Sequence, residues 1–311
     1  QAHKRFGKLS WKQILQPAID LAENGVSLTA REARGLNKIK EDLLKYNPGK
    51  TYFIKADDTE WKEGELLIQK DLAKTLRRIQ AEGRKGFYEG ETAKLLLAEM
   101  NKGGGIITQK DLDNYHAVWR EAVVENYKGL KVITMPPPSS GGIALMQLLK
   151  YVENYPLKKW GWHSDSTTQV MIEAERRVFA DRAKWLGDPD FVKVPVNELI
   201  DPAYAASRMT SMNFNQATKS ADVQAGAFPG YESPETTHYS IVDGEGNAVS
   251  ITTTLNNAYG SKVFVAGSGF LLNDEMDDFS AKAGAPNLYG LIGSKANEIQ
   301  PNKRMLSSMT P

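Results

Sequence analysis

Apolar residues recur at helical spacing through about the first 110 residues of the chain. The spacing predicts a helix over residues 11–24, which Gly25 is placed to end as a left-handed C-cap. A second helix is predicted over residues 31–46, because Thr29 and Glu32 have the spacing of a capping box in front of it. The same spacing marks two further segments, residues 71–83 and 91–105. We therefore expect this part of the chain to be mainly helical.

The pattern changes to alternation near Ala117. Residues 117–136 alternate between apolar and polar positions around a Lys-Gly pair, which predicts a β-hairpin. Helical spacing returns over residues 143–155 and again over residues 165–187, where a glycine and "DPD" end the pattern. This middle part should therefore fold as a hairpin followed by two helices.

The last third of the chain is expected to consist mainly of strands. Residues 237–243 and 248–256 read as two strands joined by "GEGN", a hairpin loop with two glycines. Residues 267–279 predict a short strand that runs into an acidic turn. The segment 221–235, rich in small and polar residues, predicts a flexible or exposed loop. Helices followed by strands predict an α+β fold.

Composition excludes several classes of function. The 311 residues are 41% hydrophobic and 25% charged, with a net charge of +1, which is ordinary for a soluble globular protein. Without a basic patch, nucleic acids and anionic membranes are poor candidate partners. No apolar run approaches the roughly 20 residues of a membrane-spanning helix. The chain has no cysteine and four widely spaced histidines, so we expect no metal site and no thiol chemistry.

Two glycine-containing motifs have ordinary explanations. The three glycines at residues 103–105 follow a predicted helix instead of opening one, which favours a C-cap and turn over a phosphate loop. The Ser-Gly-Gly at residues 140–142 stands at a predicted helix start and could bind an anion. A stiff turn with an N-cap explains that motif as well, and we favour it.

The hydroxyl clusters in the predicted hairpin 237–256 are the strongest candidates for chemistry. Threonine suits strands but is a weak nucleophile without a base. His238 lies two residues from Thr236 on the same strand face and could be that base, although a lone strand histidine is more often structural. A threonine that becomes an N-terminus has another base, because its α-amine titrates near 8. A flexible loop that leads directly into Thr236 suits the chain cut that this activation needs.

Several long motifs together resemble the γ-glutamyltransferase (γ-glutamyltranspeptidase) family of N-terminal nucleophile hydrolases. They occur in the family's order along essentially the whole chain, as "MPPPSSGG", "EAERRVFADRAKWLGDPDF", "PETTHYSIVDGEGNAVSITTTLNNAYGS", "SGFLLNDEMDDFSAKAGAPNLYG" and "PNKRMLSSMTP". The resemblance implies a four-layer αββα sandwich. It also implies a precursor that cuts itself between Glu235 and Thr236. Thr236 would then attack γ-glutamyl compounds such as glutathione, and water or an amino acid would accept the acyl group.

The resemblance also assigns roles to other residues. Thr254 matches a second threonine whose hydroxyl contacts the nucleophile. Three residues match positions that hold the substrate's α-amino group: Asn256, Glu275 and Asp278. Members of the family carry Gln or Glu at the position of Glu275. Two residues match the pair that binds the α-carboxylate: Ser307 and Ser308. Tyr289 matches a residue of the loop that covers the pocket, which some members lack.

The residues themselves agree with these roles. An amino-acid head group needs carboxylates for its ammonium and hydrogen-bond donors for its carboxylate. The stretches "NDEMDD" and "KRMLSS" supply the first and the second. Without the family resemblance, a solvated acidic turn and a polar loop would explain these two stretches as well.

The resemblance divides the chain at the predicted cut. Residues 1–235 would be the C-terminal, mostly helical part of the large subunit, and residues 236–311 the N-terminal, strand-rich part of the small subunit. The family's carboxylate-binding arginine would precede Gln1, and its oxyanion-hole glycines would follow Pro311. The chain is therefore expected to be an internal portion with an incomplete sandwich. No cofactor is expected, the partners are the substrate, the acceptor and the two subunits, and the implied location is periplasmic or secreted.

Three alternatives remain. A cephalosporin (glutaryl) acylase or a poly-γ-glutamate depolymerase belongs to the same superfamily. A glutaryl group has no α-amine, so the pair of Glu275 and Asp278 favours γ-glutamyl substrates. A binding protein on the same scaffold would have an inert nucleophile, whereas Thr236, Thr254 and both serines are intact.

Overall fold

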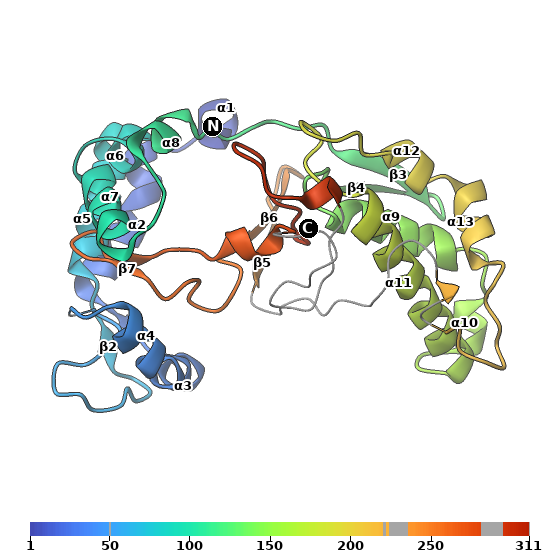
Figure 1. Cartoon of the computed structure of the whole chain (residues 1–311), viewed down its shortest axis with the longest axis horizontal. Coiled ribbons are helices and arrows are strands. Elements are labelled where there is room, and N and C mark those ends of the chain that lie inside the picture. Colours follow the sequence, from blue (N-terminus) through green and yellow to red (C-terminus); the bar gives the residue numbers. More distant parts are fainter. Residues whose placement is uncertain (50, 220–221, 224–235, 281–294, 311) are drawn as a thin grey trace. The chain divides into compact units, whose positions relative to one another are not determined.

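The chain folds into a mixture of helices and short antiparallel ladders, as the α+β prediction requires. The computed structural model describes residues 1–49, 51–219, 222–223, 236–280 and 295–310 (Figure 1). Two compact units divide the chain, one made of residues 1–119 and 259–273 and the other of residues 120–258 and 274–311. The predicted division at 235/236 concerns chain cleavage and stays a prediction.

The first unit is mainly helical. Its helices are α1 (Ala2–Phe6), α2 (Trp11–Asn24), α3 (Ala30–Lys38), α4 (Lys40–Tyr46), α5 (Lys70–Glu82), α6 (Lys85–Tyr88), α7 (Gly90–Gly103) and α8 (Gln109–Asn114). Its strands are β1 (Val26–Ser27), β2 (Leu66–Leu67), β7 (Phe264–Val265) and β8 (Phe270–Leu271), which pair as β1–β2 and β7–β8. The predicted capping box forms, with the Thr29 hydroxyl accepting from the Glu32 N–H.

Two details of the first unit differ from the prediction. The helix predicted over residues 31–46 is two helices, α3 and α4, joined at Ile39, whose φ of −94° and ψ of 4° leave the helical region. Hydrophobic spacing cannot detect this break, because buried Leu36 and Leu43 keep one periodicity across it. Gly25 ends α2 at φ 95° but with an extended ψ of 156°, not as a left-handed cap, because the chain enters β1 immediately.

The second unit contains every described element that bears on the candidate site. Its helices are α9 (Gly141–Val152), α10 (Leu157–Trp160), α11 (Asp165–Trp185), α12 (Val196–Leu199), α13 (Pro202–Met209), η2 (Glu275–Asp278) and η3 (Lys295–Asn297). Its strands are β3 (Val123–Tyr127), β4 (Leu130–Thr134), β5 (Thr236–Val242) and β6 (Ala248–Thr254). Figure 1 shows α9, α11 and α13 side by side, and buried residues of all three form one apolar cluster. The segment 221–235 lies outside the described residues except for 222 and 223.

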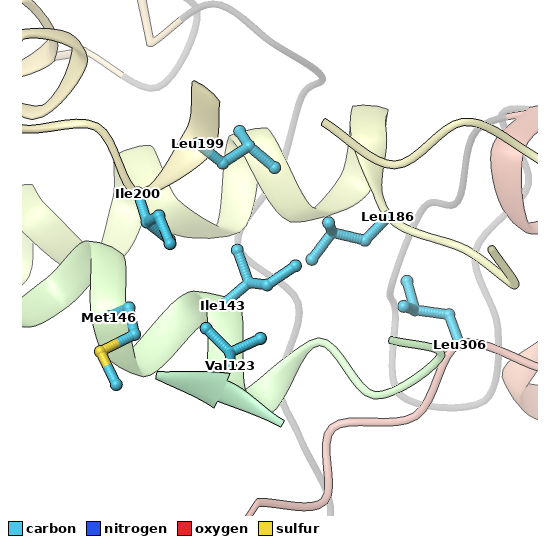
Figure 2. Packing of buried hydrophobic residues seen from close by; sticks show 7 residues of the cluster. All are labelled: Val123, Ile143, Met146, Leu186, Leu199, Ile200 and Leu306. Atoms are coloured by element: carbon cyan, nitrogen blue, oxygen red, sulfur yellow. The ribbon is translucent and has the colours of Figure 1, made fainter. Parts of the chain in front are cut away.

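A second apolar cluster connects the start of α9 to the C-terminal segment. Ile143 of α9 is fully buried and packs with Val123, Leu186 and Leu306 (Figure 2). Figure 2 shows Leu306 entering this cluster from the C-terminal segment, next to the side chain of Leu186. Burying a leucine side chain contributes about 1.5–3 kcal/mol. Leu306 therefore anchors the segment that carries the two candidate serines.

Both predicted hairpins form. β3 pairs with β4 around the Lys128–Gly129 turn, and β5 pairs with β6 around residues 244–246. Gly246 has φ 82°, the left-handed conformation that a three-residue hairpin loop requires of its last residue. In the β5–β6 ladder, apolar side chains such as Ile241 and Val249 remain exposed by 57% and 49%. The described strands form four two-stranded ladders.

Candidate active site

The register of the β5–β6 hairpin brings the two candidate catalytic threonines together. Thr236 is the first residue of β5 and its Cα partner is Thr254, the last residue of β6. The Cα atoms of residues that are directly opposite in an antiparallel pair are about 4.5–5.5 Å apart. The predicted nucleophile and the predicted second threonine are thus cross-strand partners.

The end of β6 is shaped by Thr254 and Asn256. The Thr254 hydroxyl accepts a hydrogen bond of 3.0 Å from the Asn256 N–H. Asn256 has φ 74°, in the left-handed region where asparagine is enriched, and its side chain is buried. Its Nδ2 donates to the Asp274 carbonyl at 3.3 Å. The strand end and the acidic segment are therefore in direct contact.

Asp274 holds the acidic segment against the end of β6. Its carboxylate accepts from the Asn257 N–H at 3.0 Å and from Asn257 Nδ2 at 2.5 Å. Its own N–H donates to the Leu255 carbonyl at 3.1 Å. These bonds fix the position of η2, which begins at the next residue.

η2 carries the two carboxylates that were predicted to bind an ammonium group. Burial, and then the negative charges of Asp278 and Asp274, raise the pKa of Glu275 to about 7. A carboxyl group with this pKa gains from a nearby cation, because an opposite charge favours its ionised form. The electrostatics of η2 thus suit the binding of a small cationic group.

Asn297 joins the acidic segment to the serine segment. Its Nδ2 donates to the Asp278 carbonyl at 2.6 Å, and its Oδ1 accepts from the Leu306 N–H at 2.9 Å. Lys303 Nζ donates to the carbonyls on both sides of Asn297, those of Ala296 and Glu298, at 2.9 Å each. Asn297 is buried and both of its polar groups are used.

The "MPPPSSGG" motif holds the serine segment from the other side. Ser139 forms a parallel bridge with Ser307, and the Ser140 N–H donates to the Ser307 carbonyl at 2.7 Å. A Cβ at Gly141 would lie 2.5 Å from Thr310 Cβ, and a Cβ at Gly142 would lie 1.9 Å from the Met135 carbonyl oxygen. Close backbone packing explains both glycines, in agreement with a stiff turn. The predicted side-chain cap does not form, because Ser140 stands at the N-cap of α9 without a capping hydrogen bond.

Arg182 of α11 reaches the same place. Its Nη2 donates to Ser308 Oγ at 2.7 Å and its Nε donates to Ser140 Oγ at 2.9 Å. Arg182 is 7% exposed. Ser307 is buried, whereas Ser308 is partly exposed. A buried cation therefore lies behind the hydroxyl of Ser308.

His238 has hydroxyl partners along the ladder. Its Nδ1 lies 2.8 Å from Thr252 Oγ1, and its Nε2 lies 3.1 Å from Ser240 Oγ and 3.3 Å from Ser250 Oγ. The Thr252 hydroxyl in turn donates to the Thr310 carbonyl at 3.4 Å. These contacts suit a structural role for His238, the more common role of a lone strand histidine.

The described part of the second unit contains most of the predicted site residues, and strand pairing or hydrogen bonds join the segments that carry them. These residues are Thr236, Thr254, Asn256, Glu275, Asp278, Ser307 and Ser308. The other two, Glu235 and Tyr289, lie outside the described residues. Within the described ranges, histidine and carboxylate side chains do not gather in threes around a possible metal position.

Sequence reasoning gave no positioning role to four residues that hold the others: Asp274, Asn297, Arg182 and Ser140. Arg182 and Ser140 stand in two of the quoted motifs, which was the available signal for them. Asn297 gave none, because its role depends on contacts 19 residues back and 9 residues ahead along the chain.

Comparison with solved structures defines the class. The chain superposes on the cephalosporin acylase of Bacillus halodurans with a TM-score of 0.82 and 26% identity, over 99% of this chain and 54% of that one. It superposes on the Helicobacter pylori γ-glutamyltranspeptidase with a TM-score of 0.70 and 41% identity, over 75% and 67%. The fold is that of the N-terminal nucleophile hydrolases, as predicted.

The sequence defines the family. All of residues 1–311 match the gamma-glutamyltranspeptidase family, and the chain belongs to it. A relative called "Glutathione hydrolase proenzyme" from Pseudomonas aeruginosa is 48% identical over 313 residues, which is 100% of this chain and 55% of that protein. The chain spans about half the length of the curated relatives it matches. All three of these similar proteins come from bacteria.

Proposed function

We propose that the full-length protein is a self-processing γ-glutamyltransferase and glutathione hydrolase with Thr236 as its nucleophile. The observation that supports this most is the cross-strand pairing of Thr236 with Thr254. Asp274 holds this end of the hairpin beside η2 through its bond to Asn257. Family membership and the relative named as a glutathione hydrolase proenzyme support the same activity.

The proposed nucleophile is made by a chain cut between Glu235 and Thr236. The Thr236 hydroxyl attacks the Glu235 carbonyl, the peptide bond breaks, and water hydrolyses the resulting ester. The products are a new carboxylate at Glu235 and a free α-amine on Thr236. That amine titrates near 8, so it can accept the hydroxyl proton at working pH. The name of the Pseudomonas aeruginosa relative, a proenzyme, fits this step.

The proposed reaction transfers an acyl group. The Thr236 oxygen attacks the γ-carbonyl of the substrate, and the amide nitrogen leaves after taking up the proton held by the α-amine. The γ-glutamyl ester on Thr236 is then attacked by water, which gives glutamate, or by an amino-acid amine, which gives a new γ-glutamyl amide. We expect the Thr254 hydroxyl to orient Thr236 in both steps.

Recognition of the substrate uses both of its charges. Asn256, Glu275 and Asp278 would bind the α-ammonium, and the raised pKa of Glu275 fits a carboxyl group that gains a cationic partner. Ser307 and Ser308 would bind the α-carboxylate. Tyr289, which lies outside the described residues, would belong to the loop that covers the pocket.

The acylase and the depolymerase remain the alternatives within the superfamily. The Bacillus halodurans neighbour is a cephalosporin acylase, so the fold does not decide between them. The clustered carboxylates of η2 favour a substrate with an ammonium group. The described residues show no feature that favours the inert scaffold.

The location stays a proposal. No helix among the described residues is both long enough and apolar enough to cross a membrane. We propose a periplasmic or secreted enzyme, in line with the family resemblance of the sequence.

The test compares two chromogenic probes on the purified full-length protein. L-γ-glutamyl-p-nitroanilide carries the α-amine, and glutaryl-p-nitroanilide lacks it. We expect hydrolysis of the first at a much higher kcat/KM. An equal or higher kcat/KM for the glutaryl probe would favour the acylase, and no hydrolysis of either by a processed protein would favour the inert scaffold.

A further inference from the structure

Two of the sequence motifs have residues beside the candidate carboxylate site that no proposed step has used. The "PPPSSGG" motif contributes Ser140 at the N-cap of α9, and the "ADR" of α11 contributes Arg182. Both contact the serine segment, 167 and 126 residues further along the chain. Such long-range convergence on two adjacent residues calls for a specific explanation.

The hydrogen atoms of this cluster can be assigned from donor chemistry alone. A guanidinium group has five N–H donors and no acceptor, so Ser308 Oγ must accept the 2.7 Å bond from Arg182 Nη2. In the same way, Ser140 Oγ must accept from Arg182 Nε at 2.9 Å. The Ser140 proton then has an acceptor in the Ser307 carbonyl, also 2.9 Å away.

The Ser308 proton is therefore directed away from Arg182. The backbone around Ser308 is fixed on both sides, because Ser140 binds the Ser307 carbonyl and the Ser139 hydroxyl binds the Met309 carbonyl. Ser308 itself is partly exposed. A hydroxyl in this state can donate its proton outward, and the positive charge behind it favours an anionic acceptor.

We propose that Arg182 is the positioning residue of the carboxylate site: with Ser140 it holds the Ser308 hydroxyl as a donor toward the substrate's α-carboxylate. This inference rests on the proposed function. Arg182 acts through Ser308 in this account and need not touch the substrate.

The same helix provides a matched control. Arg177 is 2% exposed, and its guanidinium binds the Arg208 carbonyl at 2.7 Å, Glu173 at 2.5 Å and the Ser211 hydroxyl at 2.7 Å. These contacts tie α11 to α13 and to the residues that follow it. Arg177 therefore has the burial of Arg182 without its contact to Ser308.

The experiment measures steady-state kinetics of the full-length protein with L-γ-glutamyl-p-nitroanilide. Arg182→Gln should raise KM about tenfold, the loss expected for one charge-assisted hydrogen bond, with a much smaller change in kcat. Arg182→Lys keeps the charge and should recover part of the affinity. Arg177→Gln should lower the urea midpoint but keep the wild-type KM. Equal KM shifts for the Gln variants of both arginines would overturn the proposal.

A double-mutant cycle tests whether Arg182 acts through Ser308. In a Ser308→Ala background, Arg182→Gln should raise KM no further, because the hydroxyl that it positions is gone. If the KM increase of the double variant equals the product of the increases of the two single variants, the residues act independently and the proposal is overturned. If Arg182→Gln does not fold, Arg182→Lys and Ser140→Ala replace it, and a wild-type KM in both would also overturn it. Failure of the proposed function is distinguishable, because the wild-type protein would then not hydrolyse the probe.

Discussion

Thr236 and Thr254 are direct cross-strand partners in the β5–β6 hairpin. The register follows from the loop at residues 244–246, because each strand residue pairs with the one equally distant from the centre of that loop. A hairpin is a local structure, so the register of this pairing is specified by the hairpin itself. The central chemical relationship of the proposed site is thus set by about twenty consecutive residues.

The Thr254 hydroxyl can be separated from the strand role of Thr254 by substitution. Thr254→Val keeps the β-branched shape but removes the proposed hydrogen bond from the Thr254 hydroxyl to Thr236. A bond of about 1–1.5 kcal/mol corresponds to about a tenfold loss in kcat. The substitution also removes the acceptor of the Asn256 N–H, so KM should rise. Thr254→Ser keeps the hydroxyl, so its kcat and its KM should stay close to those of the wild type. The measurements are kcat, KM and the fraction of processed chain.

Thr253 offers the control for that substitution. It lies next to Thr254 on the opposite face of β6 and is exposed, so Thr253→Val should behave like the wild type. Wild-type turnover and processing in Thr254→Val would show that Thr254 is only a strand residue.

The raised pKa of Glu275 predicts a pH dependence of substrate binding. The ionised carboxylate attracts the ammonium group, so kcat/KM for the γ-glutamyl probe should fall as the pH drops through about 7. Titration of the Thr236 amine affects both probes equally, so the ratio of γ-glutamyl to glutaryl kcat/KM isolates Glu275. In Glu275→Gln this ratio should be low and independent of pH. The pH range from about 5.5 to about 8 brackets the pKa of Glu275. A wild-type ratio that does not change over this range would contradict the role of Glu275 in binding the ammonium group.

The same pKa predicts an effect on stability. The folded-state pKa of about 7 exceeds the ordinary value of 4.5, so the folded protein keeps a proton that the unfolded chain has lost. Glu275 should therefore lower the free energy of unfolding progressively as the pH rises from 4.5 to 7, and this destabilisation should be complete above 7. Urea midpoints should be higher for Glu275→Gln than for the wild type at pH 8, and similar at pH 4.5. A lower midpoint at pH 8 would contradict this sign.

Asn297 should couple the two halves of the head-group site. Asn297→Asp keeps the acceptor for the Leu306 N–H but loses the donor to the Asp278 carbonyl. The loss of one hydrogen bond of about 1 kcal/mol should raise KM for the γ-glutamyl probe several-fold. The effect on the glutaryl probe should be smaller.

Asn47 is the matched control for Asn297. Both residues are 5% exposed, and Asn47 also joins two segments, through the Lys262 carbonyl at 2.7 Å and the Phe264 N–H at 2.7 Å. Asn47→Asp should lower the urea midpoint and leave the ratio between the two probes unchanged. The special role of Asn297 would be contradicted if Asn47→Asp changes the ratio of the γ-glutamyl to the glutaryl kcat/KM. It would also be contradicted if Asn297→Asp leaves this ratio unchanged.

Gly142 should be intolerant of any side chain. A Cβ there would lie 1.9 Å from the Met135 carbonyl oxygen, so Gly142→Ala forces the backbone apart at the contact between α9 and the residues before it. Overpacking of this kind costs about 1–3 kcal/mol. Gly244→Ala is the control, because its Cβ meets nothing within 4 Å and its φ is not positive. Equal urea midpoints in the two variants would show that the chain relaxes freely around Gly142.

The sequence predicts the local parts of this protein well, and the reason is physical. Capping at Thr29, the Lys128–Gly129 turn and the β5–β6 hairpin depend on residues close in the chain, whose preferences can be read directly. The break at Ile39 escaped detection, since one missing helical residue does not disturb the spacing of buried leucines.

The supporting contacts of the site could not be predicted in the same way. Arg182 and Ser308 are 126 residues apart, and nothing in the spacing of either motif specifies that they meet. The burial of Glu275 beside two carboxylates likewise depends on the bonds that Asp274 makes to Asn257. Family resemblance supplied the roles of the site residues, and the structure supplied the residues that hold them.

The most direct test of the central claim is peptide mass mapping of the full-length protein after acid quenching during turnover of the γ-glutamyl probe. The account predicts a small-subunit peptide that begins at Thr236 and carries one γ-glutamyl group as an ester on that residue. An active protein in which the peptide bond from Glu235 to Thr236 is intact, or in which the acyl group is found on another residue, would contradict it.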